Sequence, residues 1–509
     1  MDASRFRLRK AFHSAQSLFA VTFVLTFVAL VCSQRANALP AFARKYGLRC
    51  SACHETWPIL NNFGLKFRDN GYQIMNDRDA PIWQNPSYWP VTFRITPVWH
   101  RYAANSDVDT YAVSSSGVTI TPNGAIQSIE SSGFDLSGLD FHTGGTLEKN
   151  ISFYVLPSSD STAAFHFETV MARFDNLLGS PWLNVKVGRF ELNNLLSEKR
   201  AVGLTAEGGI YQTYHFIPVA DGNIFGQLGD NQLGMEYLGH SWDDRTRVSA
   251  ALLSAVDGNE NLTLCSNCYA GFFTFDQAID TGKWDVQRLG AYAMVGQAAT
   301  YYRTQNGGVP IPGSGIGNHS YYRLGFTGQL YFGPHFDLNI VTQHGEDNAW
   351  FGQGYGNAVA TDGDGGVTCT AAPPNGCPPN NTPGTTLPVG AQGPTWNGVT
   401  FEARYVFTPQ LIAIGDYELE KMSRQADGPG FLGVNPTGAT GPSPSNLGNI
   451  NNYNWLIRWN PFMTNRAGMA VQAEYTLFHQ NGTGPTSPVT GLSTSTTNSE
   501  FMLAFDFDF

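Results

Sequence analysis

The sequence predicts an all-β fold, a closed barrel of about 16 strands that crosses a membrane, preceded by a short segment of another kind. From about residue 91 onward, apolar and polar residues alternate over stretches of about ten residues, as on the two faces of a strand. Only 14% of the 509 residues are charged, against about 25% in soluble domains. No run after the amino terminus reaches the ~18 apolar residues that an α-helical span needs.

Residues 1–38 are predicted to be a secretory signal peptide. Basic residues at 5–10 precede an apolar run of about 14 residues, Leu18–Val31, and Ala36-Asn37-Ala38 is a small-residue cleavage site. A lone membrane-anchor helix is the alternative, but a span needs ~20 residues. The predicted mature chain of 471 residues carries 25 Lys+Arg and 40 Asp+Glu, a net charge of −15. This charge excludes a basic nucleic-acid binder.

The alternation is clearest in the last ten residues, Glu500–Phe509. Phe501, Leu503, Phe505 and Phe507 share one face there, while Asp506 and Asp508 lie on the other. Further predicted strands are Ala467–Leu477, Tyr453–Trp459, Val399–Phe407, Tyr322–Phe332 and Phe336–Ile340. Each stretch therefore has one apolar and one polar face.

A soluble β-sandwich would alternate in the same way, so three further features carry the membrane prediction. The strands are long, the charged residues lie on the inward-facing positions, and aromatic residues recur near strand ends. The terminal Phe509 resembles the end of bacterial outer-membrane barrels. At about 26 residues per strand and loop, roughly 420 residues form ~16 strands, enough to enclose an aqueous lumen. The long loops Gly356–Pro394, Gly428–Asn449 and Gly482–Asn498 are expected on the extracellular side.

The predicted chemistry lies before the barrel, at Cys50-Ser51-Ala52-Cys53-His54. This is the C-x-x-C-H pattern of covalent c-type haem attachment. Thiols three residues apart reach the two vinyl groups of one haem, and the adjacent imidazole of His54 becomes the proximal axial ligand. A disulfide or thioredoxin-type redox pair is the alternative, but no βαβ pattern surrounds the motif. A zinc site lacks a second Cys/His pair within finger spacing.

The sixth ligand of such a haem is left open between two kinds of residue. Met75 lies 21 residues after His54 and is the only methionine between the signal peptide and the barrel. As a distal ligand it would raise the reduction potential. If Met75 is only an apolar contact, a barrel-wall histidine such as His100 could ligate instead. Trp57–Phe67 is expected to form a short helix against the porphyrin.

The predicted organisation is a signal peptide at 1–38, a monohaem cytochrome segment at 39–88 and a transmembrane barrel at 89–509. A segment of about 50 residues is near the size below which a domain seldom buries a sufficient core alone. We therefore expect the cytochrome segment to plug the barrel. No catalytic acid–base constellation is evident.

Four cysteines remain in predicted loops. Cys265 and Cys268 have C-x-x-C spacing, but Tyr269 follows them where a haem motif has histidine. Together with Cys369 and Cys377 they are most simply loop disulfides of an oxidising compartment. Their pairing cannot be read from the sequence.

The run from Pro40-Ala41-Phe42-Ala43-Arg44 through Gly47 to the haem motif, followed by a barrel ending at Phe509, resembles the fused monohaem cytochrome–porins of iron-oxidising bacteria. The resemblance implies one haem c, held by Cys50 and Cys53 with His54 as proximal ligand. It also implies an Fe(II):cytochrome c oxidoreductase-like role in the outer membrane, from extracellular Fe(II) to a periplasmic c-type cytochrome.

The sequence departs from that family in one place, because Lys45-Tyr46 replaces the usual Gln-Thr. The stretches 60–64 and 67–72 also resemble a broader set of exported cytochrome-like proteins. The electron donor is thus either Fe(II) or another small molecule. The alternatives are a passive or substrate-selective porin with a haem-bearing plug, and a conduit that carries electrons outward to reduce metals. In each case the partners include outer-membrane lipid and exclude nucleic acid.

Overall fold

The computed structural model describes the following residues: 42, 45–48, 50–56, 59–74, 90–107, 111–113, 118–120, 126–159, 164–205, 208–216, 218, 228–229, 231–254, 269–282, 286–299, 318–348, 393–424, 448–463, 467–482 and 495–509. The predicted signal peptide lies outside these residues. So do Met75 and the four loop cysteines Cys265, Cys268, Cys369 and Cys377.

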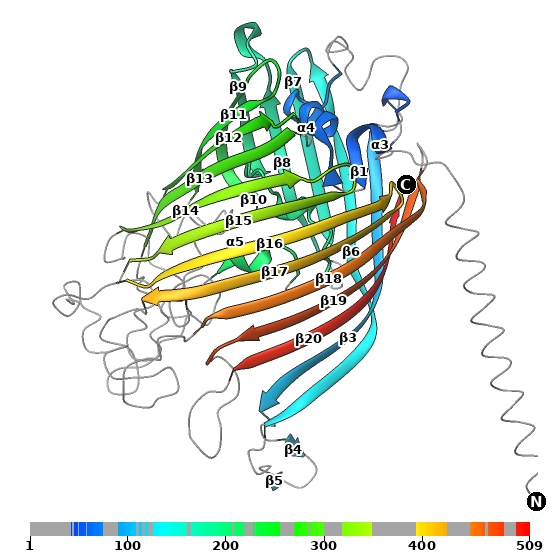
Figure 1. The fold of residues 1–509 in the computed structure, drawn as a ribbon, viewed down its shortest axis with the longest axis vertical. Coiled ribbons are helices and arrows are strands. Elements are labelled where there is room, and N and C mark those ends of the chain that lie inside the picture. Colours follow the sequence, from blue (N-terminus) through cyan, green and yellow to red (C-terminus); the bar gives the residue numbers. More distant parts are fainter. Residues whose placement is uncertain are drawn as a thin grey trace, which may run out of the picture.

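Sixteen antiparallel strands form one closed barrel within the described residues (Figure 1), which confirms the predicted all-β class and strand number. The strands are β3 (Val91–Asp107), β6 (Ile126–Glu148), β7 (Ile151–Ser159), β8 (Phe165–Phe174), β9 (Asn184–Glu191), β10 (Asn231–His240), β11 (Thr246–Ser254), β12 (Tyr269–Asp280), β13 (Val286–Ala299), β14 (Asn318–Tyr331), β15 (Phe336–Glu346), β16 (Thr395–Thr408), β17 (Leu411–Arg424), β18 (Ile450–Met463), β19 (Gly468–Gln480) and β20 (Thr496–Asp508). Every neighbour along the chain pairs, and β20 pairs with β3. A small hairpin of β4 (Tyr111–Val113) and β5 (Val118–Ile120) lies outside the barrel sheet.

The barrel closes where the two ends of its chain meet. The amide of Phe93 donates to the carbonyl of Phe509 at 2.8 Å, and the amide of Phe509 donates back at 3.0 Å. The two aromatic rings also stack, with centroids 5.6 Å apart. Closure pairs the first strand of the sheet with the last, as a barrel in lipid requires because hydrocarbon offers no hydrogen bonds.

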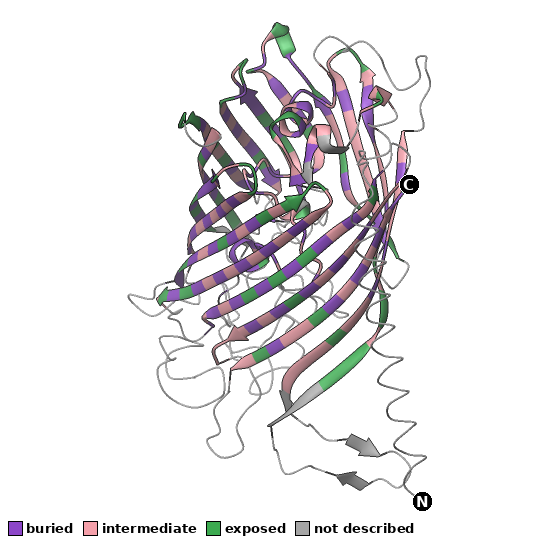
Figure 2. Ribbon diagram, turned by 45° about the vertical axis from the view of Figure 1, so that its right-hand side comes forward, coloured by how far each residue is buried: buried purple, intermediate pink, exposed green. Residues whose placement is uncertain are grey.

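The outer face of the wall is apolar. Along β14, Leu324 and Phe326 are exposed, Phe326 by 70%, while Gly325 between them is buried. Figure 2 shows buried and more exposed residues alternating along the strands. A soluble sandwich would cover such a face, whereas a lipid-facing wall exposes it. The chain is therefore an outer-membrane barrel. Among the described residues, no helix has the length and apolar character of a membrane span.

The inner face carries the charged residues, as the alternation predicts. Asp506 of β20 pairs with Arg94 at 2.9 Å and with Arg458 at 2.7 Å, and all three side chains are largely buried inside the wall. Pairing offsets part of the free-energy cost of removing these charges from bulk water. The lumen wall is thus polar but electrically compensated at this point.

The two ends of the barrel differ. Strands β6 and β7 are joined by Lys149-Asn150, and β16 and β17 by Pro409-Gln410. Figure 1 shows the carboxyl terminus at this end, which faces the periplasm in barrels of this type. The three predicted long loops connect strands at the opposite end, and most of their residues lie outside the described part; β20 begins at Thr496, inside the third of them.

The connection between β9 and β10 folds into the lumen, which the sequence did not predict. We call its described residues, 192–205 and 208–216, the inner segment. It contains the short helices η2 (Glu198–Arg200) and α5 (Tyr211–His215). Tyr214 of α5 is buried beside Phe272 and other apolar residues of the wall. On the other side, Val202 packs against Ile414 and Leu456. Apolar contacts therefore run from the β11–β13 wall across the lumen to β17 and β18.

Lumen carboxylates hold the inner segment in place. Glu474 accepts from the amide of Leu204 at 2.7 Å and from the hydroxyl of Thr205 at 2.7 Å. Glu418 accepts from the amide of Gln212 at 3.0 Å, and Glu420 accepts from the hydroxyl of Thr213 at 2.6 Å. A carboxylate can satisfy several donors at once. The alternation along the strands does not predict that these inward-facing acids bind the inner segment.

Candidate functional site

The described residues between 42 and 74 form a compact unit around the haem motif, which we call the N-terminal unit. Helix α3 (Cys50–Cys53) is followed by β1 (His54–Thr56), β2 (Ile59–Leu60) and helix α4 (Asn62–Asp69). Strands β1 and β2 pair, with His54 opposite Leu60. The predicted helix over Trp57–Phe67 is wrong in its bounds, because Asn61 has extended backbone angles and caps a helix that begins only at Asn62.

Asn61 ties the two helices together. Its side-chain oxygen accepts from the amide of Gly64 at 2.9 Å, which caps α4. Its side-chain nitrogen donates to the carbonyl of Ala52 at 3.2 Å, and its backbone amide donates to the carbonyl of Cys53 at 2.9 Å. One residue thus orients the cysteine-bearing helix relative to α4.

Gly64 allows this close approach. A Cβ atom placed on Gly64 would lie 2.0 Å from the carbonyl oxygen of Cys53. Because the obstacle is backbone, it cannot rotate away as a side chain would. Any larger residue at this position would push α3 and α4 apart.

Cys53 and His54 line one cavity of about 420 Å³. His54 is only 6% exposed, and Cys53 is a free, half-buried thiol whose pKa burial raises to about 11. The backbone of Cys50 belongs to α3, but its side chain lies outside the described part. The volume falls within the range of ~300–1,000 Å³ typical of cofactor and ligand sites. The thiol of Cys53 and the adjacent imidazole of His54, which line this cavity, are two of the three groups of the C-x-x-C-H motif.

The cavity is enclosed from three sides. The N-terminal unit contributes Leu60 and Phe67, the inner segment contributes Leu192, and the barrel wall contributes Met171 and Phe190. These apolar side chains surround a space that also has polar walls. The cavity therefore exists only because the N-terminal unit lies inside the barrel, where it plugs the lumen as expected.

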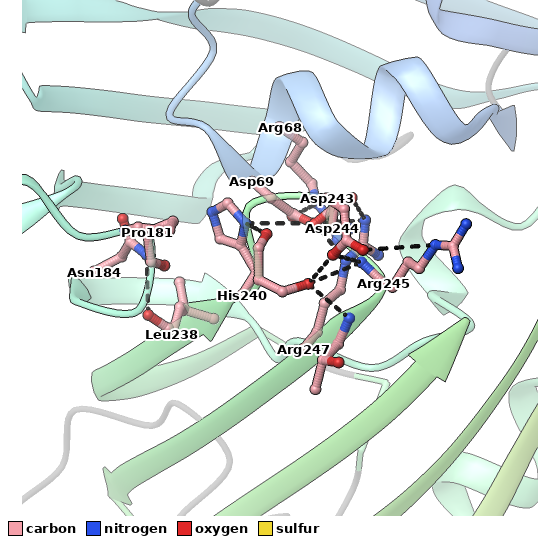
Figure 3. Close-up of polar contacts among 12 residues, drawn as sticks. Arg68, Asp69, Pro181, Asn184, Leu238, His240, Asp243, Asp244, Arg245 and Arg247 are labelled. Atoms are coloured by element: carbon pink, nitrogen blue, oxygen red, sulfur yellow. Dashed lines mark hydrogen bonds and ion pairs between the residues drawn. The ribbon is translucent and has the colours of Figure 1, made fainter. Parts of the chain in front are cut away.

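The end of α4 is bound to the wall by charge. Asp69 pairs with Arg247 of β11 at 3.0 Å (Figure 3), and Arg173 of β8 donates to the carbonyl of Arg68 at 2.9 Å and to that of Asp69. Burial raises the pKa of Asp69, but Arg247 and Arg68 lower it by more, so this pKa stays below the ordinary range. Asp69 is thus a carboxylate at neutral pH.

Aromatic stacking and a tight turn complete the docking. Tyr72 stacks on Phe42 and on Tyr154 of β7, with ring centroids 5.1 Å and 6.0 Å apart. Gly71 has a φ of +70°, and a Cβ on it would lie 2.1 Å from the Asp175 carboxylate. The stretch 67–72 therefore serves to attach the N-terminal unit to the wall.

The candidate ligands of a haem iron lie in different places. His100 is not among the residues that line the cavity, and its Nδ1 lies 3.2 Å from Glu500. Met75 lies outside the described residues, so its role stays a prediction. Two histidines that the sequence analysis missed, His142 of β6 and His240 of β10, line the cavity with His54. No local signal marks them, because only barrel closure brings β6, β10 and the N-terminal unit together. No group of three or more His, Cys, Asp or Glu side chains suited to a metal occurs in the described chain.

Comparison with other proteins gives matches of fold only. Neither a protein-family model nor a curated protein matches the sequence. Among solved structures, the chain is similar to the outer membrane channel DcaP of Acinetobacter baumannii, with 10% identity and a TM-score of 0.45 over 82% of this chain and 96% of that one. It is also similar to an anion-selective porin from Comamonas acidovorans, with 10% identity and a TM-score of 0.40 over 82% and 99% of the two chains. OmpT of Vibrio cholerae matches with 9% identity and a TM-score of 0.38 over 82% and 97%.

Proposed function

We propose that this outer-membrane barrel is an electron-transfer conduit of the fused cytochrome–porin type, with one covalently bound c-type haem. The observation that supports it most is that Cys53 and His54 line one cavity inside a closed barrel. A haem held there would supply reversible one-electron transfer at its iron. Cys50 and Cys53 would bind it as thioethers, and His54 would be the proximal ligand.

The surrounding residues would insulate and position this group. Asn61 and Gly64 keep α3 against α4, and apolar residues such as Leu60, Phe67 and Phe190 would contact the haem. The barrel wall separates the cavity from lipid, and its strands form hydrogen bonds with one another around the barrel. No acid or base is needed for electron transfer, because the chemistry belongs to the cofactor.

The position of the N-terminal unit supports transfer to a periplasmic c-type cytochrome. The unit lies at the short-connection end of the barrel, which faces the periplasm. Extracellular Fe(II), or another small donor, would deliver electrons from the opposite side. The net charge of −15 favours the approach of cations. Glu418, Glu420 and Glu474 contribute little to this attraction, because they bind the inner segment.

A porin with a haem-bearing plug is the second candidate, and the polar inner face of the wall favours it. The inner segment and the N-terminal unit oppose it, because both pack across the lumen. An outward-directed, metal-reducing conduit would share the same haem site and differ in its reduction potential.

Two measurements on the purified, detergent-solubilised protein test the proposal. Mass spectrometry should give the mature chain plus one haem, and redox titration should show that Fe(II) reduces this haem. A mature chain without the added mass overturns the proposal. A haem that no external donor reduces, together with solute flux in liposomes, supports the porin. A strongly negative potential supports the outward-directed conduit.

A further inference from the structure

We infer that His240 of the barrel wall is the second axial ligand of the haem iron. The inference rests on the proposed haem at Cys50, Cys53 and His54, and it adds a barrel residue that would bind the same haem. The haem would then link the N-terminal unit to the barrel, because His54 of the unit and His240 of the barrel would both bind its iron.

His240 is the last residue of β10, beside the end of α4. Figure 3 shows it next to Asp69, and it lines the same cavity as Cys53 and His54. The residue is 8% exposed. A histidine in this place is therefore removed from water and faces the space in which the proposed haem would lie.

The hydrogen bonds of His240 leave its other nitrogen free for a metal. Nδ1 lies 3.1 Å from the carbonyl oxygen of Ser241, which can only accept, so Nδ1 carries the proton. The carboxylate of Asp244 lies 3.6 Å from the same nitrogen and favours that proton further. Nε2 is then a lone-pair donor. Metal-binding histidines commonly have this arrangement, in which a carbonyl or carboxylate orients the ring through the opposite nitrogen.

Nε2 of His240 is buried and has no hydrogen-bond partner among the residues that the structure describes. Buried polar atoms almost always have a partner in a folded protein. An iron atom in the cavity would supply one that the polypeptide does not.

The other side chains near the cavity are less suited to this role. Nδ1 of His142 lies 2.6 Å from the Tyr154 hydroxyl, and its Nε2 lies 4.0 Å from Asp140. Met171 lines the cavity but packs against the buried apolar cluster of the wall. His100 lies outside the cavity lining, beside Glu500. Met75 remains the competing ligand from the sequence, and the test includes it.

The test uses the full-length protein in detergent, after mass spectrometry has established one attached haem. In the unmutated protein we expect a low-spin ferric haem whose near-infrared magnetic circular dichroism and electron paramagnetic resonance indicate two histidine ligands. In His240→Ala we expect loss of the low-spin signal and rapid binding of carbon monoxide to the reduced form. Added imidazole should restore the low-spin spectrum. His100→Gln and Met75→Leu are the matched controls and should keep the unmutated spectrum.

Three outcomes would overturn the inference while leaving the haem in place: a high-spin unmutated protein, a low-spin His240→Ala protein without imidazole, or loss of the low-spin state in Met75→Leu. If His240→Ala does not accumulate, the near-infrared band of the unmutated protein still decides between His–His and His–Met coordination. Absence of any attached haem would overturn the proposed function itself, and the inference with it.

Discussion

At the scale of single residues, Asn61 shows how one side chain positions a binding motif. It caps α4, and it also holds the carbonyl groups of Ala52 and Cys53. The cap uses the oxygen of the side-chain amide and the link to Ala52 uses its nitrogen, whereas the link to Cys53 comes from the backbone amide. The two contributions can therefore be separated by substitution.

We expect Asn61→Ala to destabilise the N-terminal unit by about 1 kcal/mol or more, the usual cost of losing an N-cap. Asn61→Asp keeps the oxygen that caps Gly64 but loses the donor to Ala52, so its effect should be smaller. The measurement is the thermal midpoint for protease cleavage within residues 39–88, compared among the three proteins. Equal midpoints for Asn61→Ala and the unmutated protein would contradict the positioning role.

At the scale of elements, the docking of α4 depends on a carboxylate that stays charged. Since the pKa of Asp69 is lowered in the folded protein, its ion pair stabilises docking fully above the unfolded value of about 3.9. This contribution is lost only as the pH falls through the lower, folded value. The contribution of Asp69 to docking should therefore be constant between about pH 5 and 8.

Asp69→Asn should weaken this docking by about 1–3 kcal/mol. The cost stays below the ~3–5 kcal/mol of an uncompensated buried charge, because Asp244 still pairs with Arg247 at 2.5 Å. Release of the N-terminal unit by urea, followed by proteolysis, measures the loss. Asp243→Asn is the matched control, because Asp243 lies in the adjacent turn but is exposed. An equal loss in both variants would show that docking does not depend specifically on the ion pair between Asp69 and Arg247.

The inner segment makes a prediction about permeability. Glu474→Ala removes the acceptor for Leu204 and Thr205 and should loosen the segment. We expect a higher single-channel conductance in planar bilayers than for the unmutated protein. Glu500→Gln is the control, because Glu500 of β20 instead faces His100 of the neighbouring strand β3. An unchanged conductance in Glu474→Ala would mean that other contacts hold the segment closed.

At the scale of the whole molecule, the barrel provides the enclosure that the N-terminal unit lacks. The cavity has walls from three parts of the chain, and the unit's own charges and rings are paired with β7, β8 and β11. A short segment on its own could not bury this much surface. Plug and barrel are therefore expected to be stable only together.

Expression of residues 39–88 alone, with the haem-attachment machinery, tests this dependence. We expect a segment that is degraded or that holds a solvent-exposed, high-spin haem, since the wall residues around the cavity are missing. Absorption spectra and carbon monoxide binding measure the difference from the full chain. A low-spin, protected haem in the excised segment would show that the barrel is not needed for enclosure.

The amino-acid sequence by itself determined the barrel, its strand number, the inward and outward faces and the C-x-x-C-H motif. Each is encoded within a few residues: alternation has a period of two, and the haem motif spans five positions. The terminal strand illustrates this, because Phe501 and Asp506 face outward and inward as their parity requires.

Only the tertiary structure decided how the lumen is filled and which wall residues surround the cavity. The contacts of Glu474 with Thr205 and of Arg247 with Asp69 join residues far apart in the chain. Such pairs depend on the register of sixteen strands and on closure between β3 and β20, which no local pattern records. For the same reason the sequence did not predict that His240 lines the cavity. Its place beside α4 follows from the path of the whole barrel rather than from its neighbours in sequence.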